Sequence, residues 1–307
     1  MRHVRILGLA LVAVFAFGAI AASNALALKN PRKSGQIFKH CPIYGEAEGK
    51  QTTLCFVAAT EEGAEEGAYH VGNFTVHLAK QVLLQFGTSV NEETGQEYFV
   101  PAEGAPTLPP VAERVPGYPI SKISPQEQTE MGWPQELKEN YENGRKHHET
   151  VNVYETLELA GTPAISRSNL LSEEGTAVEV PLKIKATNTW LAKLGDICYV
   201  GSEEDPIVQH LVSGLSTSPL TGEELHGAVG ELEFLHSFQE VIITHSDLVD
   251  NTYPVPAATC SGPFSSYVEA MINKIFGLPA AAGASNTQLK GTLYNATAEW
   301  VGTFGIH

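Results

Sequence analysis

The chain has 307 residues, enough for one large domain or two ordinary ones. It carries 19 basic and 35 acidic residues, and this formal net charge of −16 supplies no basic face for nucleic-acid binding. Because 43% of the residues are hydrophobic and only 18% are charged, the chain can bury a sizeable core, which excludes wholesale disorder.

The N-terminus predicts a signal peptide over residues 1–27. A short basic start precedes an unbroken apolar and glycine run, residues 6–22. The Ala-Leu-Ala at 25–27 has the small side chains that signal peptidase requires, so we expect cleavage after Ala27. An uncleaved anchor is the alternative, since the run is close to the length that spans a bilayer. After cleavage we expect no transmembrane segment.

Four cysteines remain after cleavage: Cys41, Cys55, Cys198 and Cys260. An even number in an oxidising compartment favours two disulfides. Three pairings are available, and the sequence alone does not choose among them. We expect Cys41–Cys55 and Cys198–Cys260, because each pair lies within one structured half and closes the shorter loops. No cysteine has the spacing of a zinc site, so we expect no metal there.

Residues 28–100 are predicted as an N-terminal β region. One strand is expected over 51–58, and apolar and polar residues alternate over 71–78 and again over 82–86, which is the pattern of half-buried strands. Eight prolines then lie between positions 101 and 134, and each removes a backbone donor. We therefore expect a proline-rich linker or surface excursion over 101–146, with at most a short polar helix that lacks an apolar face.

Residues 147–307 are predicted as a C-terminal β domain. Its clearest strand is 178–186, in which five apolar residues alternate with Glu, Pro and Lys, and Pro181 favours an edge position. Other strands are expected at 150–159, 197–200, 207–212, 230–234, 241–245 and 289–301. Short strands at this spacing predict an all-β fold, mostly an antiparallel sandwich or barrel. Whether the two β regions pack as one domain stays open.

One C-terminal amphipathic helix is predicted over 263–276. Pro263 suits a first turn, Ser261 or Gly262 can cap it, and Gly277 ends it. Its apolar stripe most simply packs on a sheet, and a partner-binding or membrane-surface role is the less favoured alternative.

No assembled catalytic motif is present. His147 and His148 are adjacent, so in an extended chain they point to opposite faces and do not chelate one ion. His245 and Asp247 would share a strand face, but no Gly-x-Ser-x-Gly motif accompanies them, and a turn-capping Asp247 is the favoured interpretation. A metalloprotease motif, a phosphate-binding loop and a dinucleotide fingerprint are also absent. We therefore assign no catalytic, cofactor-binding or metal-binding residue.

The acidic clusters at 61–66 and 203–205 match no calcium-loop pattern and are interpreted as solvated loops. A sugar-stacking platform formed by Trp133, Trp190 and Trp300 is one interpretation, but core or rim packing is the favoured one. A glycosidase-like pair of carboxylates cannot be located among 35 acids. Two glycosylation sequons begin at Asn73 and Asn295.

Several segments resemble a known group of proteins. They are Val-Pro-Leu-Lys-Ile-Lys at 180–185, Cys-Tyr-Val-Gly-Ser at 198–202, 213–219, 248–257 and Gly-Leu-Pro at 277–279, with a looser match at 41–42 and 71–76. They resemble exported, functionally uncharacterised proteins of high-GC Gram-positive bacteria. Residues 188–195 depart from the Asn-Pro-Phe-Leu-Gly of that group. The resemblance implies an exported class, supports the Cys198–Cys260 pair, and implies no activity.

These observations favour a secreted or cell-envelope β-rich protein that acts as a structural or binding surface, in contact with the envelope or a glycan. Two alternatives stay open. One is a secreted hydrolase with an unlocated carboxylate pair, for which two facing acids in a concave pocket would be diagnostic. The other is a carbohydrate-binding module, which requires aligned exposed aromatic side chains.

Overall fold

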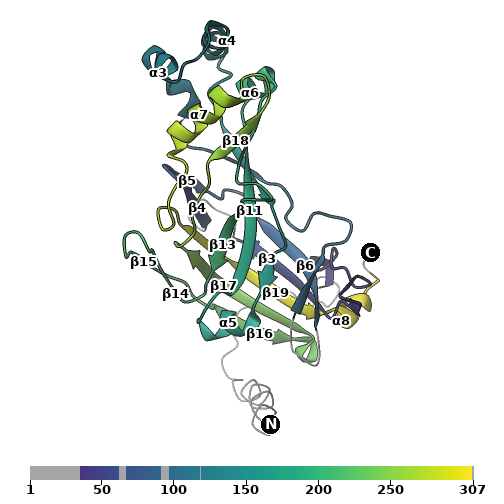
Figure 1. The fold of residues 1–307 in the computed structure, drawn as a ribbon. Coiled ribbons are helices and arrows are strands. Elements are labelled where there is room, and N and C mark those ends of the chain that lie inside the picture. The colour runs from purple at the N-terminus through teal and green to yellow at the C-terminus, as the bar shows by residue number, and fades with distance from the viewer. Residues whose placement is uncertain (1–34, 62–66, 91–96, 118, 306–307) are drawn as a thin grey trace.

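A computed structural model describes residues 35–61, 67–90, 97–117 and 119–305. The predicted signal peptide, residues 1–27, lies outside these ranges. The molecule is elongated, with two antiparallel sheets along its length and a group of helices at one end (Figure 1). Strands predominate over helices, so the all-β expectation is confirmed.

The first sheet has eight strands, all paired antiparallel. They are β3 (Leu54–Thr60), β4 (Gly67–Val71), β5 (Phe74–His77), β6 (Leu83–Val90), β7 (Glu97–Pro101), β16 (Glu231–Leu235), β17 (Glu240–Asp250) and β19 (Thr287–Thr297). The main order is β16-β17-β19-β3-β6-β7, and the β4–β5 hairpin joins it through β19. The strand β16 therefore ends the sheet on one side.

The second sheet has seven strands, also antiparallel. They are β8 (Ala112–Arg114), β9 (Tyr154–Leu159), β10 (Ala164–Ile165), β11 (Val178–Thr187), β12 (Ile197–Val200), β13 (Ile207–Leu211) and β18 (Ala258–Ser261). The order is β18-β12-β11-β9-β8, with β10 and β13 also paired to β11. Two small hairpins complete the strands: β1 (Glu46–Ala47) with β2 (Lys50–Gln51), and β14 (Leu215–Thr217) with β15 (Glu224–His226).

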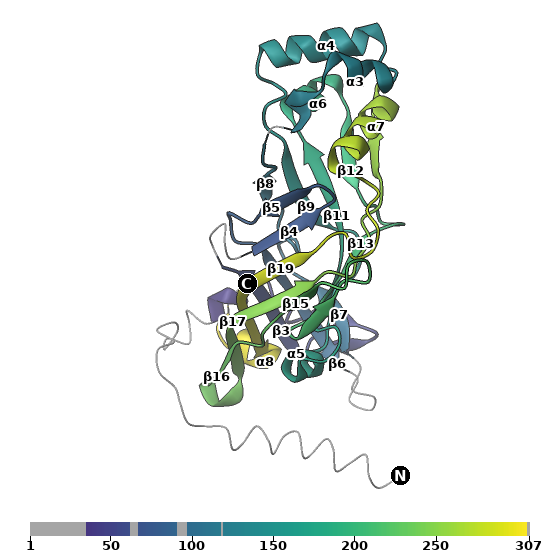
Figure 2. The ribbon, with the colours of Figure 1, turned by 90° about the vertical axis from the view of Figure 1, so that its left-hand side faces the viewer.

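The two predicted β regions share one sheet. β3 pairs with β19 along its full length, from Leu54 opposite Thr297 to Thr60 opposite Gly291. Apolar side chains of both sheets then form one continuous core, which includes Phe86 of the first sheet and Ile184 of the second. Figure 2 shows the long strands of the second sheet rising from the first sheet toward the helices.

The proline in β11 does not mark an edge. β11 pairs with β9 and β10 on one side and with β12 and β13 on the other, so the expected edge position is wrong. The carbonyl of Pro181 accepts the Ala160 N–H, at the point where β9 has ended and β10 has not begun. The nitrogen of Pro181 faces the same gap, because the N and C=O of one strand residue point to the same side. In this gap neither β9 nor β10 needs the N–H that Pro181 lacks.

The proline-rich segment is more ordered than the expected linker over 101–146. Besides β8 it forms a 3-10 turn (Pro119–Lys122), α3 (Pro125–Glu130) and α4 (Gln135–Lys146). Ser124 caps α3 with a capping box, and Pro125 occupies the first turn, where a missing N–H costs nothing. The helix α4 was expected to lack an apolar face, yet it buries Leu137 and Tyr141.

The predicted C-terminal helix is present as α7 (Ser265–Phe276). Its apolar side, which includes Val268 and Met271, is buried in the main core, so the packing expectation is confirmed. Gly277 ends it in a left-handed conformation, but Phe264 precedes it without a side-chain cap. Shorter helices not expected from the sequence are α5 (Arg167–Ser172), α6 (Thr189–Leu194) and α8 (Ala298–Gly302).

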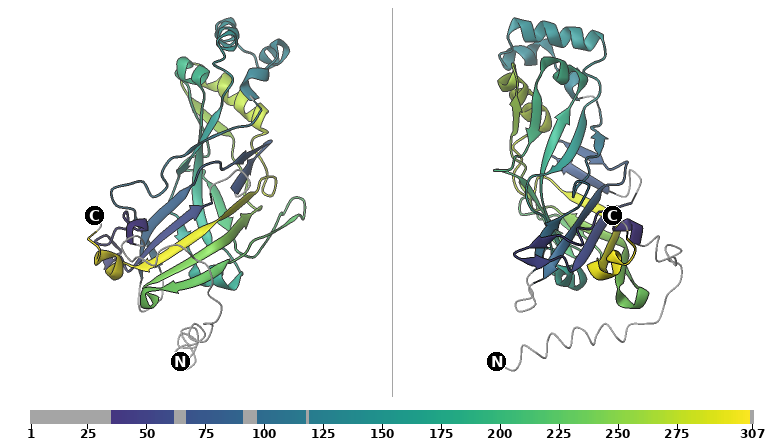
Figure 3. Two further views of the ribbon diagram at one scale, coloured as in Figure 1. Left: turned by 180° about the vertical axis from the view of Figure 1, so that it is seen from behind. Right: turned by 90° about the vertical axis from the view of Figure 1, so that its right-hand side faces the viewer.

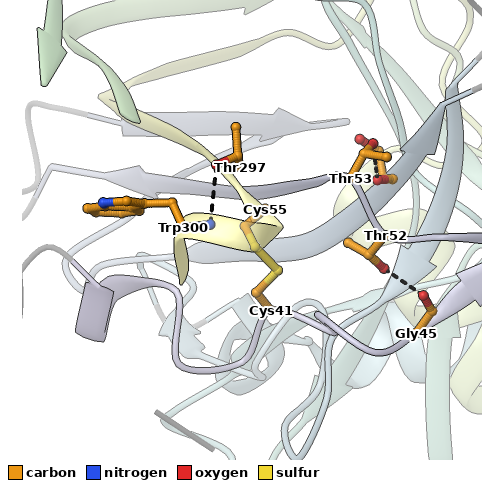
Figure 4. The surroundings of a disulfide bond; sticks show 8 residues. Cys41, Gly45, Thr52, Thr53, Cys55, Thr297 and Trp300 are labelled. Carbon is orange, nitrogen blue, oxygen red and sulfur yellow. Dashed lines mark hydrogen bonds between the residues drawn. A yellow bond between two sulfur atoms is a disulfide. The ribbon is translucent and has the colours of Figure 1, made fainter. Parts of the chain in front are cut away.

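Both expected disulfides are present. Cys41–Cys55 fastens the segment before β1 to the outer face of the first sheet, beside α8 (Figure 4). Thr297 caps α8 by accepting the Trp300 N–H, as the same figure shows. Cys198–Cys260 joins directly opposed residues of β12 and β18. Each bridge therefore links elements that already pack together.

Removing either disulfide should lower the free energy of unfolding, and by more for the longer loop. The pairs are separated by 14 and 62 residues. In the chain-entropy model this gives a loss of roughly 3 kcal/mol for Cys41→Ser/Cys55→Ser and about 4 kcal/mol for Cys198→Ser/Cys260→Ser. Chemical denaturation of the two double variants measures both, and a larger loss from the shorter loop would contradict this order.

Candidate functional site

A groove lies where the inner face of the first sheet extends past the second. Its floor is two rows of side chains in register across neighbouring strands. One row is Phe56 on β3, Asn295 on β19, Val241 on β17 and Phe234 on β16; the next is Leu293, Ile243 and Leu232 on the last three of these strands. Alternate residues of a strand share one face, so both rows point into the groove.

The helix α5 forms the opposite wall of the groove. The strand β10 leads directly into α5, and the hydroxyl of Ser166 caps it by accepting the Asn169 N–H. Ile165, Leu170 and Leu171 line the wall. Figure 1 places α5 beside β16, at the end of the molecule opposite the helical group, and Figure 3 shows this end from two further sides. The groove encloses about 680 Å³, within the range of small-molecule sites.

The groove floor becomes more exposed toward the sheet edge. Phe56 and Leu293 are buried, but Leu232 and Phe234 on β16 are each 38% exposed. Nothing in the described part of the second sheet covers this last strand, so its apolar side chains face the groove and water. Glu231 and Glu233 alternate with them on β16, and charges of this kind hinder edge-to-edge pairing with another chain.

The polar groups that line the groove carry no net charge, because the two charged side chains, Arg167 and Glu97, form an ion pair. Arg167 Nε and Nη2 both donate to Glu97 Oε1, at 3.1 and 2.5 Å. Glu97 Oε2 is buried and has no hydrogen-bond partner among the described residues. The hydroxyls of Ser166 and Ser168 lie 3.1 Å apart on the same wall. The groove therefore combines an apolar floor with one ion pair, two hydroxyls and the amide of Asn295.

A second polar cluster is buried between the sheets. Glu113 on β8 and Glu155 on β9 are directly opposed, and they are only 5% and 2% exposed. The Tyr69 hydroxyl, from the first sheet, donates to Glu155 Oε2 at 3.2 Å, and the Lys80 backbone N–H donates to Glu113 Oε1 at 3.0 Å. Nearby, Gln209 Nε2 donates to Thr287 Oγ1 at 2.8 Å. The bonds from Tyr69 and Gln209 join the two sheets through an interior that is otherwise apolar.

Burial raises the pKa of Glu155 to about 7, although the hydrogen bond from Tyr69 partly opposes this. The same burial, together with the nearby carboxylate of Glu155, raises the pKa of Tyr69 well above its ordinary value. Perturbed groups of this kind are common at active sites. Neither glutamate lines the groove, however, and both are closed off from solvent. Glu113 and Glu155 are therefore two facing acids, but they do not lie in the concave pocket that a hydrolase requires.

His245 and Asp247 do not form a pair. A bulge between Ile243 and Ser246 breaks the alternation of β17, and His245 has a left-handed φ of 56°. Its ring is 73% exposed and lies 3.3 Å from Glu61 Oε1. Asp247 stays in the strand and accepts a hydrogen bond from the Gln288 side chain at 2.7 Å, so the expected turn-capping role is wrong.

The remaining histidines and acids of interest lie on exposed turns. His147 and His148 follow the end of α4 rather than an extended chain, and His147 Nδ1 contacts the Asn143 carbonyl. In the cluster at 203–205, two backbone N–H groups donate to the Ser202 hydroxyl. Residues 62–66 lie outside the described ranges. Within those ranges, no group of His, Cys, Asp and Glu side chains is placed to hold a metal ion.

The tryptophans serve packing. Trp133 and Trp190 are buried with stacked rings 6.1 Å apart, and Tyr141 meets both edge-on, so the core interpretation is confirmed for these two. Trp300 is half-buried and stacks on His236. Of the sequon asparagines, Asn73 is exposed and donates to the Ile275 carbonyl, while Asn295 lies in the groove floor.

Sequence reasoning missed both the groove and the buried acids. A signal for Glu155 was available, because β9 alternates and places Glu155 on the same side as Leu157 and Leu159. An acid in that row is expected to be buried. No comparable signal marks the groove, since it depends on which strand of one sheet the other sheet leaves uncovered.

Comparisons of the chain with protein-family models, with curated proteins and with solved structures found no match. Among the described residues, no helix combines the length and the apolar character that crossing a membrane requires. The groove therefore has to be interpreted from its own side chains.

The raised pKa of Glu155 should make stability depend on pH. The unfolded chain loses this proton near the ordinary pKa of 4.5, while the folded protein holds it up to about 7. The contribution of protonated Glu155 to stability is therefore complete below pH 4.5 and is lost as the pH rises through 7. The resulting change in the free energy of unfolding is about 3 kcal/mol. Glu155→Gln should remove this part of the pH dependence.

Denaturation of the unmodified protein and of Glu155→Gln at a series of pH values measures the difference. Glu158→Gln is the matched control, because Glu158 belongs to the same strand and points to the other side. Parallel pH profiles for the unmodified protein and Glu155→Gln would show that Glu155 is not the titrating group.

Proposed function

We propose that this protein is an exported, non-enzymatic binding protein whose groove takes an amphipathic small molecule with an apolar body and an uncharged, hydroxyl-bearing head. The observation that carries this proposal is the exposed pair Leu232 and Phe234, which continues the buried apolar rows of the first sheet to its edge. Exposed apolar surface continuous with a cavity of this size is typical of ligand sites.

The floor supports binding of the apolar body. A ligand that covers Leu232 and Phe234 removes their side chains from water, and each square ångström of buried apolar area contributes about 25 cal/mol. The strands beneath are hydrogen-bonded on both sides except at β16, and α5 is held by its cap. The floor and wall are thus preorganised, so that little ordering opposes binding.

The polar wall supports an uncharged head. Arg167 is already engaged by Glu97, so a carboxylate ligand would gain little from the guanidinium and would meet the negative charge of Glu97. The net charge of −16 adds to this repulsion. A hydroxyl can instead exchange hydrogen bonds with the side chains of Ser166 and Ser168, which line the groove wall.

The two disulfides support a location outside the cytosol. Bonds of this kind persist in oxidising compartments and are rare in the cytosol. Together with the predicted signal peptide and the resemblance to exported proteins of high-GC Gram-positive bacteria, they favour an extracellular or cell-envelope location. A binding role is favoured over hydrolysis, because Glu113 and Glu155 are buried away from the groove.

A polar substitution in the floor should weaken binding of a small amphiphile. Replacing Leu232 by Ser removes apolar contact in the groove, and the affinity for monooctanoylglycerol should fall about tenfold, which corresponds to about 1.4 kcal/mol. Leu215→Ser is the matched control, since Leu215 is an exposed leucine of the β14–β15 hairpin that does not line the groove. Equilibrium dialysis measures both affinities.

The head-group preference is measured on the unmodified protein in the same way. Octanoate should bind more weakly than monooctanoylglycerol at neutral pH. Equal losses in Leu232→Ser and Leu215→Ser would contradict the groove as the binding site, and tighter binding of octanoate would contradict the uncharged head.

A further inference from the structure

An internal cavity adjoins the groove. It lies between the two sheets and has a volume of about 90 Å³. Its exposed lining is mostly apolar, with Ala58, Leu84 and Leu289 from the first sheet and Val178 and Val180 from the second, while Tyr69, Gln209, Ser246 and Thr287 also border it. A mostly apolar lining of this kind favours apolar groups.

The groove and this cavity share one wall residue. Leu293 lines both, and it is buried. Along the inner face of β19, Asn295 and Leu293 face the groove, and Gly291 and Leu289 face the cavity. From Asn295 to Leu289 the strand extends about 20 Å at its usual rise per residue. One strand face thus leads from the groove floor into the interior.

The opposite layer shows the same continuity. Ile165, in the groove wall, is paired directly with Val178, in the cavity wall. On β19 and on the β10–β11 pair, the residues that pass from groove to cavity are apolar, whereas β17 contributes Ser246 at the boundary. At this boundary β17 carries its bulge, which shifts the register from Ile243 opposite Leu293 to Ser246 opposite Gly291. Gly291 presents no side chain, and a Cβ there would lie only 2.3 Å from the Ala59 carbonyl oxygen.

We propose that groove and cavity form one channel for a single long acyl chain, which passes Leu293 and ends in the interior. This inference rests on the proposed function and names its ligand class: an amphiphile with one long chain and an uncharged head. The inner cavity, at about 90 Å³, has room for the end of one chain but not for a second chain or a ring system beside it. The Leu293 side chain is the gate, displaced when the chain enters.

The test compares two chain lengths with the same head. Monomyristoylglycerol and monooctanoylglycerol are measured by equilibrium dialysis below their micellar concentrations. Ala58→Leu fills the inner cavity from the first sheet, and Val180→Leu does so from the second. Each should weaken binding of the long chain about tenfold, because several methylene groups lose their buried site, and should leave the short chain unchanged.

Ala112→Leu is the matched control, because it makes the same change at an exposed position of β8 that lines neither cavity. Thermal unfolding shows whether each variant is folded. The two cavity-filling substitutions lie in different sheets, so if one variant does not fold, the other still tests the channel. Equal effects on both chain lengths, or none on either, would overturn the channel while leaving groove binding intact. If the unmodified protein binds neither ligand, the proposed function fails as well.

Discussion

The pairing of β3 with β19 is the constraint on which the rest of the molecule depends. These strands are separated by more than two hundred residues, yet they form the centre of the first sheet and place Phe56 beside Asn295. The floor of the groove, the wall of the inner cavity and the outer cluster under the Cys41–Cys55 bridge all use residues of these two strands.

The unequal extent of the two sheets explains why the molecule has a site at one end and a closed core at the other. The long strands of the second sheet run toward the helices, where Trp133, Tyr141 and Trp190 fill the interior. At the other end α5 and the residues leading into it lie opposite the edge of the first sheet, and they leave the β16 side chains partly uncovered. The groove is a result of this offset.

Much of the strand pattern could be predicted from local alternation. The apolar rows of β11 and the stripe of α7 face the core as their spacing indicates, because burial on one side fixes the period. Long-range facts could not be predicted. Pro181 suggested an edge because a sequence does not show the gap between β9 and β10. The exposure of Leu232 could not be predicted, because it depends on what lies opposite its strand. His245 failed as a candidate because a bulge is invisible in the alternation that it interrupts.

The position of Asn295 has a practical consequence for producing the protein. Its sequon sits mid-strand between β3 and β17, on the face that forms the groove floor. A eukaryotic secretory host that adds an oligosaccharide to the nascent chain would place a bulky sugar where two strands must later close, and would yield material that is misfolded or blocked. Expression in a host without this modification avoids the conflict.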